Sequence, residues 1–333
     1  MNFVSADMLK SNQKCHVQIM EEYLTTNNAR EIDDETFLRT GNEYHLCMKL
    51  LWTEERFNIV SDNFYEWEQE IKKSYDFLIE NQSDRPDCNM IMQEHGAKEI
   101  VILNRRLFNV INSIRMYRDQ VLHDLSALDS RMKCNFEKET HRQYDKTFSY
   151  QIMEFLRNFI QHQGLIIERI TATIPFSKKL NNELWYYVEA NYPTIEKIEK
   201  YEKKIKNPPD GKIEWLNLIV VMREYFSQIV DLHNYFRCIT EERYISAIQC
   251  LRKTIERVYG DLPVKVIAFH GKEKQDDFQD FLLQMVYIDR LEEYRNMDAV
   301  LDETQYYISK KPYLESDKIK VSNSVTCHFR YNK

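Results

Sequence analysis

Glycine and proline are scarce in this chain, with 6 Gly and 7 Pro among 333 residues. Average usage of the two residues together is about 12%. An all-β sandwich or barrel needs a turn roughly every 8 to 12 residues, and glycine and proline supply most turns. This scarcity excludes such folds and predicts a mainly α protein with long helices and a few short strands.

Long apolar runs are also missing. No stretch approaches the roughly 18 uninterrupted apolar residues that suggest a membrane-spanning helix. Residues Met1–Lys10 carry neither the basic region nor the apolar region of a signal peptide. We therefore expect no membrane association and a cytoplasmic location.

Cysteine pairs at metal-binding or redox spacing are absent, although the chain has 7 cysteines. The number is odd, the residues are widely scattered and no CxxC motif occurs, a pattern typical of reduced thiols in the cytosol. The same spacing argues against a zinc site. Gly-rich phosphate loops, a GxSxG elbow and an HExxH motif are also lacking, so we expect neither a metal nor a cofactor.

The chain has no excess of positive charge, since its net charge is -7 at pH 7. A protein that coats nucleic acid without sequence preference must neutralise many phosphates, which this total disfavours. Between Ala97 and Ile170, however, 12 Lys and Arg face 9 Asp and Glu, a local +3 that leaves -10 for the rest. This offset is either sampling noise or a modest basic island that holds a polyanion.

Apolar periodicity predicts three helices in the first half of the chain. They span Ser61–Asn81, Ala97–Leu125 and Phe148–His162, and the middle one has a near-heptad apolar stripe. The last ends just before Gly164, the residue type at which helices commonly stop. Earlier in the chain we predict a helix over Met8–Leu24, and we leave Tyr44–Leu51 open between a strand and a buried turn of helix.

In the second half of the chain, the sequence pattern predicts a mixture of helices and short strands. Helical patterning suggests helices at Leu184–Ala190, Thr194–Lys206, Ile213–Phe236, Glu241–Tyr259 and Asp276–Met297. Strands are predicted at Leu165–Ile174, Pro263–Phe269 and Ile319–Phe329. The segment NPPDG, Asn207–Gly211, is the clearest break.

One polar constellation interrupts this apolar pattern, in the segment EFLRNFIQHQG at Glu154–Gly164. Asn158 and His162 are four residues apart and so share one helix face, and the long side chain of Arg157 reaches the same edge. A permanently charged guanidinium beside an imidazole that titrates near neutrality suits phosphodiester chemistry. The first neutralises phosphate charge and the second moves a proton.

The hexamer RNFIQH resembles the RNxxxH form of the Arg-x4-6-His motif of HEPN proteins, a superfamily of small helical bundles that includes many metal-independent ribonucleases of toxin and antiphage systems. The resemblance covers roughly residues 61–164. It implies that Arg157 and His162 are catalytic, with Asn158 in support, and that they face their symmetry mates in a homodimer. It also implies an RNA substrate, attacked by its own 2′-OH, and an antitoxin or defence-system partner protein.

Three more polar residues lie on the helix that precedes this motif. Asn112, Arg115 and Asp119 are spaced at i, i+3 and i+7, which stacks them on one face. They match loosely the polar residue that HEPN proteins carry on that helix, and we take them as substrate-binding or supporting residues. The resemblance divides the chain into an N-terminal segment (1–60), an HEPN-like bundle (61–175) and a mainly helical C-terminal region (176–333).

Other interpretations of the same residues stay open. Arg39 with His45 and Arg118 with His123 satisfy the same bare spacing. A structural alternative pairs Arg157 with Glu154, while His162 caps the helix and Asn158 bonds to backbone. At the level of function, the alternative to an endoribonuclease is a non-catalytic dimeric scaffold or binding protein, with a nucleotide-binding sensor as a third reading.

Overall fold

A computed structural model of the chain has a mainly helical fold, which confirms the predicted fold class. It describes residues 14–21, 24–25, 29–81, 88–162, 164–173, 185–197, 205, 213–260, 265–272, 279–296 and 329–331. Within these residues the helices are α1 (Asp34–Glu80), α2 (Cys88–Leu128), α3 (Ser130–Lys146), α4 (Phe148–His162), α5 (Tyr192–Glu196), α7 (Leu218–Tyr259) and α8 (Met285–Asn296). No helix in the described part is long and apolar enough to cross a membrane.

The strands are short and form two antiparallel sheets. They are β1 (Cys15–Glu21), β2 (Leu24–Thr25), β3 (Arg30–Ile32), β4 (Arg169–Thr173), β5 (Trp185–Asn191), β6 (Ile213–Asn217), β7 (Val266–His270), β8 (Phe281–Gln284) and β9 (Phe329–Tyr331). One sheet has the order β2-β1-β7-β8 with β3 also paired to β1, and the other has the order β4-β5-β6-β9.

The chain forms two compact units, and α1 and α7 each contribute to both. The first unit contains residues 1–55 and 237–297, and the second contains 56–236 and 298–333. The division of the sequence at residues 60 and 175 remains a prediction.

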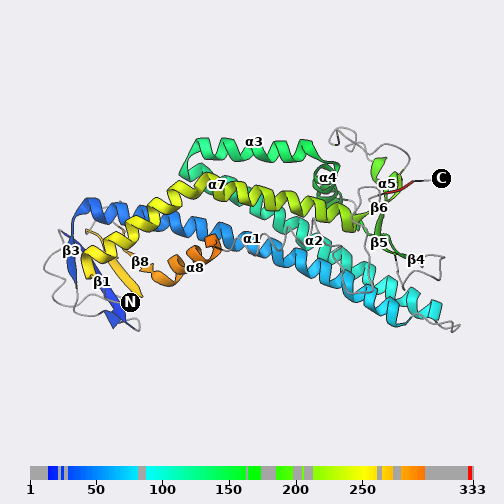
Figure 1. Cartoon of the computed structure of the whole chain (residues 1–333), viewed down its shortest axis with the longest axis horizontal. Helices are drawn as coiled ribbons and strands as arrows, with labels where there is room; N and C mark the ends of the chain where they lie inside the picture. The colour runs from blue at the N-terminus through cyan, green and yellow to red at the C-terminus, as the bar shows by residue number, and fades with distance from the viewer. Residues whose placement is uncertain are drawn as a thin grey trace. The chain divides into compact units, whose positions relative to one another are not determined.

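In the first unit, the sheet packs against α1 through aromatic rings (Figure 1). Phe281 of β8 stacks on Phe269 of β7, with 4.5 Å between ring centroids, and lies edge-on to Phe37 of α1. Gly41 of α1 leaves room for this ring, because a Cβ there would lie 3.2 Å from Phe281.

Helix α8 is held in the same unit by a buried cluster of charges. The Glu54 carboxylate of α1 accepts a hydrogen bond from Arg237 Nη2 of α7 at 2.7 Å, and Arg295 Nε of α8 lies 3.1 Å from its other oxygen. Two arginines on one carboxylate tie three helices together.

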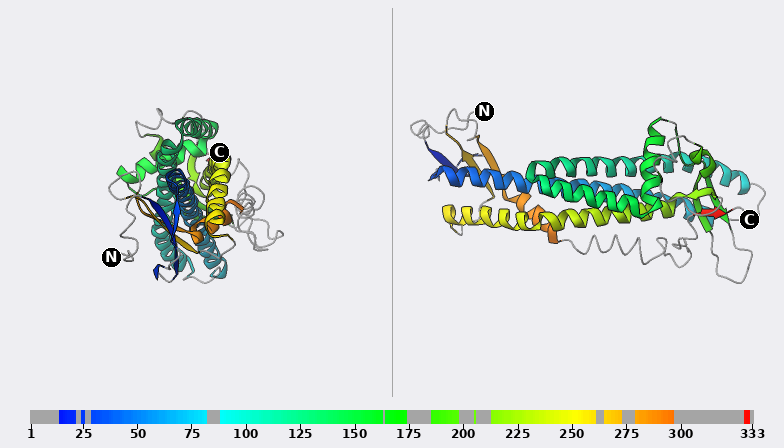
Figure 2. Two further views of the ribbon diagram at one scale, coloured as in Figure 1. Left: turned by 90° about the vertical axis from the view of Figure 1, so that its left-hand side faces the viewer. Right: turned by 90° about the horizontal axis from the view of Figure 1, so that it is seen from above.

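In the second unit, α1, α2 and α7 run alongside one another, and α4 lies across them (Figures 1 and 2). Phe64 of α1 stacks on Phe226 of α7 at 4.0 Å. His233 of α7 is fully buried, stacks on Phe57 of α1 at 3.8 Å and shares a hydrogen bond with the Tyr117 hydroxyl of α2 at 2.9 Å. This histidine is a packing residue of the helical core.

The predicted helices of the first half are present but longer than expected. Helix α1 begins at Asp34, so it absorbs the open segment Tyr44–Leu51 as well as the predicted helix Ser61–Asn81. Its first turn is capped by Asp33, whose carboxylate accepts hydrogen bonds from Thr36 N at 2.7 Å and Thr36 Oγ1 at 2.8 Å. Helix α4 has the bounds that were predicted for it, Phe148–His162. No helix is predicted where α3 lies.

The predicted helix Met8–Leu24 is wrong from Cys15 onward, since β1 occupies Cys15–Glu21. Cys15, Val17 and Ile19 are buried on one side of that strand, a period of two that the helical interpretation overlooked. Residues 1–13 lie outside the described part of the chain.

Two predicted helices of the middle region also need correction. The segment predicted as a helix over Leu184–Ala190 forms strand β5 from Trp185 onward, as its run of aromatic and β-branched residues favours, and 184 lies outside the described residues. Thr194–Lys206 contains only the end of the short helix α5 among its described residues, with 198–204 and 206 outside them. The predicted strand Leu165–Ile174 is confirmed only over β4 at Arg169–Thr173, with 174 not described.

The C-terminal predictions are mixed. Ile213–Phe236 begins with strand β6, and its helix continues without a break through Glu241–Tyr259 as α7, because no glycine or proline interrupts residues 218–259. Asp276–Met297 is likewise not one helix, since β8 pairs with β7 before α8 begins. The strand predicted at Pro263–Phe269 is confirmed over Val266–Phe269, which belong to β7, while 263 and 264 lie outside the described residues. Residues 207–211 and 319–328 lie outside the described residues.

Candidate functional site

Helix α4 positions the residues of the RNxxxH motif near its end. Its buried face includes Ile152, Met153 and Leu156, all with no exposed surface. The helix ends at His162, and Gly164 follows with a φ of 131°, a conformation that side-chain-bearing residues rarely adopt. The buried face and this glycine together explain why the motif sits in the last turns of a helix.

The structure brings Arg157 and Asn158 into direct contact. Arg157 Nη2 donates a hydrogen bond to Asn158 Oδ1 at 2.7 Å, which holds the guanidinium against the next side chain. Both residues are half-buried, whereas His162, one turn further, is exposed. Arg157 Nε is buried and has no hydrogen-bond partner within the described residues. The site therefore combines a held cation with an accessible imidazole.

Glu154, the alternative partner for Arg157, is used elsewhere. Its carboxylate pairs with Arg118 of α2 and accepts a hydrogen bond from the Tyr225 hydroxyl of α7 at 2.7 Å. The Arg118 guanidinium also lies over the ring of Tyr150, 5.6 Å from its centroid. Burial raises the pKa of Tyr150 and of Tyr225, so both phenols remain protonated and Tyr225 remains a donor.

This cluster of Arg118, Glu154, Tyr150 and Tyr225 was missed by sequence reasoning. Its members come from α2, α4 and α7, and only Glu154 and Tyr150 are close in sequence. It fixes α4 to its neighbours and leaves Arg157 free of Glu154. The cluster also separates the two residues of the alternative motif, Arg118 and His123. The Arg118 side chain lies within the cluster and is 13% exposed, whereas the His123 side chain is 77% exposed.

The segment after α4 is attached to α2 by one asparagine. Asn104 Oδ1 accepts hydrogen bonds from the backbone N–H groups of Ile166 and Ile167, both at 3.0 Å. Asn104 Nδ2 donates to the carbonyl oxygen of Ile167 at 3.0 Å. All three residues are buried. Asn104 thereby fixes the chain four residues after His162 and positions the end of α4.

The second predicted group lies on the outer side of α2. Arg115 Nε forms an ion pair with Asp119 Oδ2 at 2.7 Å, and both side chains are more than a third exposed. Asn112 is half-buried on the same face. Among the described residues, no hydrogen bond or ion pair joins Asn112, Arg115 or Asp119 to Arg157, Asn158 or His162.

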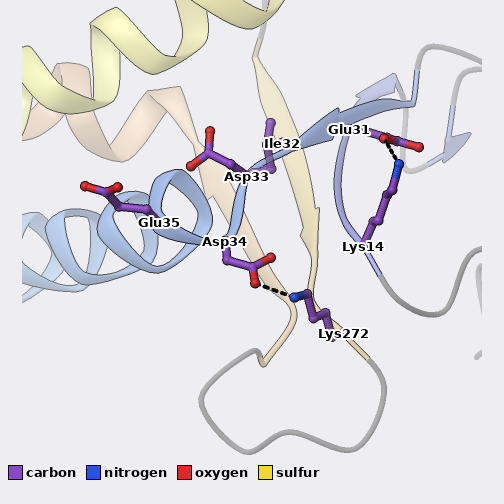
Figure 3. A pocket seen from close by; sticks show the side chains of 7 residues that line it. All are labelled: Lys14, Glu31, Ile32, Asp33, Asp34, Glu35 and Lys272. Atoms are coloured by element: carbon purple, nitrogen blue, oxygen red, sulfur yellow. Dashed lines mark hydrogen bonds and ion pairs between the residues drawn. The ribbon is translucent and has the colours of Figure 1, made fainter.

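A pocket of about 770 Å³ lies in the first unit, at the start of α1. Figure 3 shows its lining of Lys14, Glu31, Ile32, Asp33, Asp34, Glu35 and Lys272. Most of these charges are already matched, since Lys14 pairs with Glu31, Lys272 pairs with Asp34 and Asp33 caps α1. The pocket is accounted for by local ion pairs and helix capping.

Metal-ligand clusters are not found in the part of the chain that the structure describes: no group of three or more His, Cys, Asp or Glu residues is placed to hold an ion. The chain matches no protein-family model, no curated protein and no solved structure. The geometry at the end of α4 is therefore the main guide to function.

Proposed function

We propose that this chain is a metal-independent endoribonuclease of the HEPN type, active as a homodimer. The observation that carries the proposal is the hydrogen bond from Arg157 to Asn158, which holds a guanidinium one turn before the exposed His162. The resemblance of RNFIQH to the RNxxxH motif supports the same assignment. An effector role in a toxin or antiphage system, with a matching antitoxin or defence partner, follows from that resemblance.

The chemistry assigned to these residues needs no cation. His162 removes the proton from a ribose 2′-OH, whose oxygen attacks the adjacent phosphorus while the bond from phosphorus to the 5′-oxygen breaks. The leaving 5′-oxygen takes up a proton from the second copy's His162 or from water. Arg157 stabilises the negative charge that develops on the phosphorane oxygens. The products are a 2′,3′-cyclic phosphate and a 5′-hydroxyl end.

The decisive experiment measures RNA cleavage by the full chain in EDTA. We expect cleavage of RNA, no cleavage of the same sequence as DNA, and 2′,3′-cyclic phosphate ends, because DNA lacks the attacking hydroxyl. His162→Ala should lower the rate about 100-fold or more, the usual size of a lost proton-transfer group. His162 is exposed, so the variant should keep the wild-type circular dichroism spectrum and melting temperature.

His123→Ala is the matched control, since His123 is also exposed and follows an arginine at the same spacing. At chain concentrations where both proteins are dimeric, it should leave the rate unchanged. If His123→Ala abolishes cleavage and His162→Ala does not, the wrong histidine has been assigned. If no RNA cleavage is detected, or neither variant alters it, the ribonuclease proposal fails.

A second candidate is a non-catalytic dimeric scaffold. Exposed apolar side chains on α2, at Val101, Phe108 and Met116, favour it because such residues commonly mark contact surfaces. A wild-type chain that dimerises without cleaving RNA would support this alternative.

A further inference from the structure

One face of α2 is exposed along most of its length and mixes apolar with charged side chains. We call it the α2 stripe, and it consists of Val101, Arg105, Phe108, Asn112, Met116, Asp119 and His123. At steps of three or four residues, these positions fall on one side of a helix. Val101 is 62% exposed, Phe108 43% and Met116 44%. Large apolar side chains repeated on one face suggest a contact surface.

The spacing of the α2 stripe is the same in both directions from its centre. Counting outward from Asn112, the stripe continues in steps of 4, 3 and 4 residues toward either end of the helix. When two copies of a helix pack antiparallel about a two-fold axis, residues equally far from the centre lie opposite each other. The α2 stripe therefore superimposes on itself in such a pair.

Two of the three pairs of residues that this symmetry places opposite each other are chemically matched, and the third is Val101 with His123. Phe108 would meet Met116 of the second copy, a sulfur–aromatic contact. Arg105 would meet Asp119 of the second copy, and the symmetry makes each contact twice. Arg105 forms no ion pair within the described residues, whereas Asp119 is held in place by Arg115 on the same helix at 2.7 Å. An unpaired cation thus faces a fixed anion.

We propose that the α2 stripe binds the α2 stripe of a second copy of this chain, with the two helices antiparallel and Asn112 on the two-fold axis. The matched pairs of Arg105 with Asp119 and Phe108 with Met116 select this occupant, because opposite charges and a sulfur–aromatic contact then meet twice across one two-fold axis. The inference shares with the proposed function only the expectation of a homodimer. It names the surface that forms it.

The interface is a modest one. The α2 stripe runs over 23 residues, about 33 Å of helix at 1.5 Å rise per residue. A single pair of helices gives an interface toward the small end of those that form stable complexes. We therefore expect a dimer that dissociates in the micromolar range.

The experiment is a charge exchange followed by sedimentation equilibrium on the full chain, at about 1 to 100 µM in low salt. Arg105→Glu alone places a carboxylate opposite Asp119 at both symmetry-related contacts, and Asp119→Arg alone places a guanidinium opposite Arg105 at both. Each variant should weaken the dimer about tenfold or more, because like charges across an interface repel. An equimolar mixture of the two variants should restore it, since both cross-pairs then have opposite charges.

Arg131→Glu on α3 is the matched control, because Arg131 is 90% exposed and the change in charge is the same. It should leave the dimer at wild-type strength. Circular dichroism of every variant verifies that folding is intact, and recovery in the mixture is itself evidence that both variants fold.

Three outcomes would overturn the inference. The wild-type chain could remain a monomer up to 100 µM, which is far above the dissociation range expected of such an interface. The dimer could survive both single variants, or fail to recover in the mixture. The single variants could instead lower the melting temperature of a monomer, which would mean that the chain's own segments cover the stripe. RNA cleavage on the same samples separates the two proposals. An α2-dependent dimer without cleavage removes only the ribonuclease, cleavage by a dimer that the α2 variants leave intact removes only this interface, and cleavage by a monomer removes both this interface and the homodimer of the proposed function.

Discussion

Glu68 of α1 and Arg223 of α7 form a two-pronged ion pair in the core of the second unit. Arg223 Nε and Nη2 donate to the two carboxylate oxygens of Glu68, each at 2.9 Å. The Glu68 side chain is completely buried and that of Arg223 is 3% exposed. Because water reaches neither charged group, each charge depends on the other.

Removing one member of this pair should destabilise the chain strongly. Glu68→Leu or Arg223→Met should each cost about 3 to 5 kcal/mol of unfolding free energy, because the remaining charge stays buried after the two-pronged ion pair is lost. Glu68→Leu combined with Arg223→Met should recover most of the loss. Urea denaturation of all four proteins gives the coupling energy, and additive losses in the double variant would contradict a direct pair.

Asn104→Ala should loosen the segment that follows α4. The change leaves the backbone N–H groups of Ile166 and Ile167 buried without an acceptor, which should cost about 2 to 4 kcal/mol. Asn104→Asp keeps an acceptor oxygen but places a buried carboxylate oxygen against the carbonyl oxygens of Ile100 and Ile167, so it should not recover the loss. Hydrogen exchange should show faster exchange at Ile166 and Ile167 in the alanine variant, and unchanged protection there would mean that Asn104 does not hold the segment.

The cysteines should differ sharply in reactivity. Cys134 and Cys238 are exposed, whereas Cys15 and Cys47 are buried. Burial raises the pKa of Cys15 to about 11, with the Asp34 carboxylate adding to the effect, and burial raises the pKa of Cys47 to about 12. Because the thiolate is the reactive form, iodoacetamide at pH 8 should label Cys134 and Cys238 before Cys15 and Cys47. Peptide mass spectrometry would detect the contrary result, early labelling of Cys15 or Cys47.

His95 should make the second unit less stable in mild acid. Its Nε2 lies 3.2 Å from Ser74 Oγ and its ring stacks on Phe77. Burial lowers the pKa of His95 below its ordinary value near 6.5, and Lys98 contributes to the decrease. The unfolded chain therefore binds the proton first as the pH falls, and stability decreases from about pH 6.5 down to the lowered pKa of the folded state.

The variant His95→Gln removes this titration while keeping a polar group beside Ser74. The stability of the wild-type chain should fall more than that of the variant between pH 7 and pH 5, as measured by thermal melts. An identical pH dependence for the two proteins would show that His95 does not contribute.

Much of the helical framework could be predicted because helix formation is local. The apolar stripes of Ala97–Leu125 and Phe148–His162 follow from i, i+3 and i+4 contacts within one segment, and Gly164 marks an end by its own conformational freedom. Strands were harder to recognise. Trp185–Asn191 becomes β5 only by pairing with β4 and β6, contacts that lie outside the segment itself.

The sequence by itself determined the mainly helical fold, the absence of a long apolar span and the placement of Arg157, Asn158 and His162 in one helical segment. Only the tertiary structure decided how these residues are used. It assigned Glu154 to Arg118 and Tyr225, which left Arg157 to bond with Asn158. The physical reason is that a buried charge must find its partner wherever folding brings one, and for Glu154 that partner lies 36 residues away on another helix.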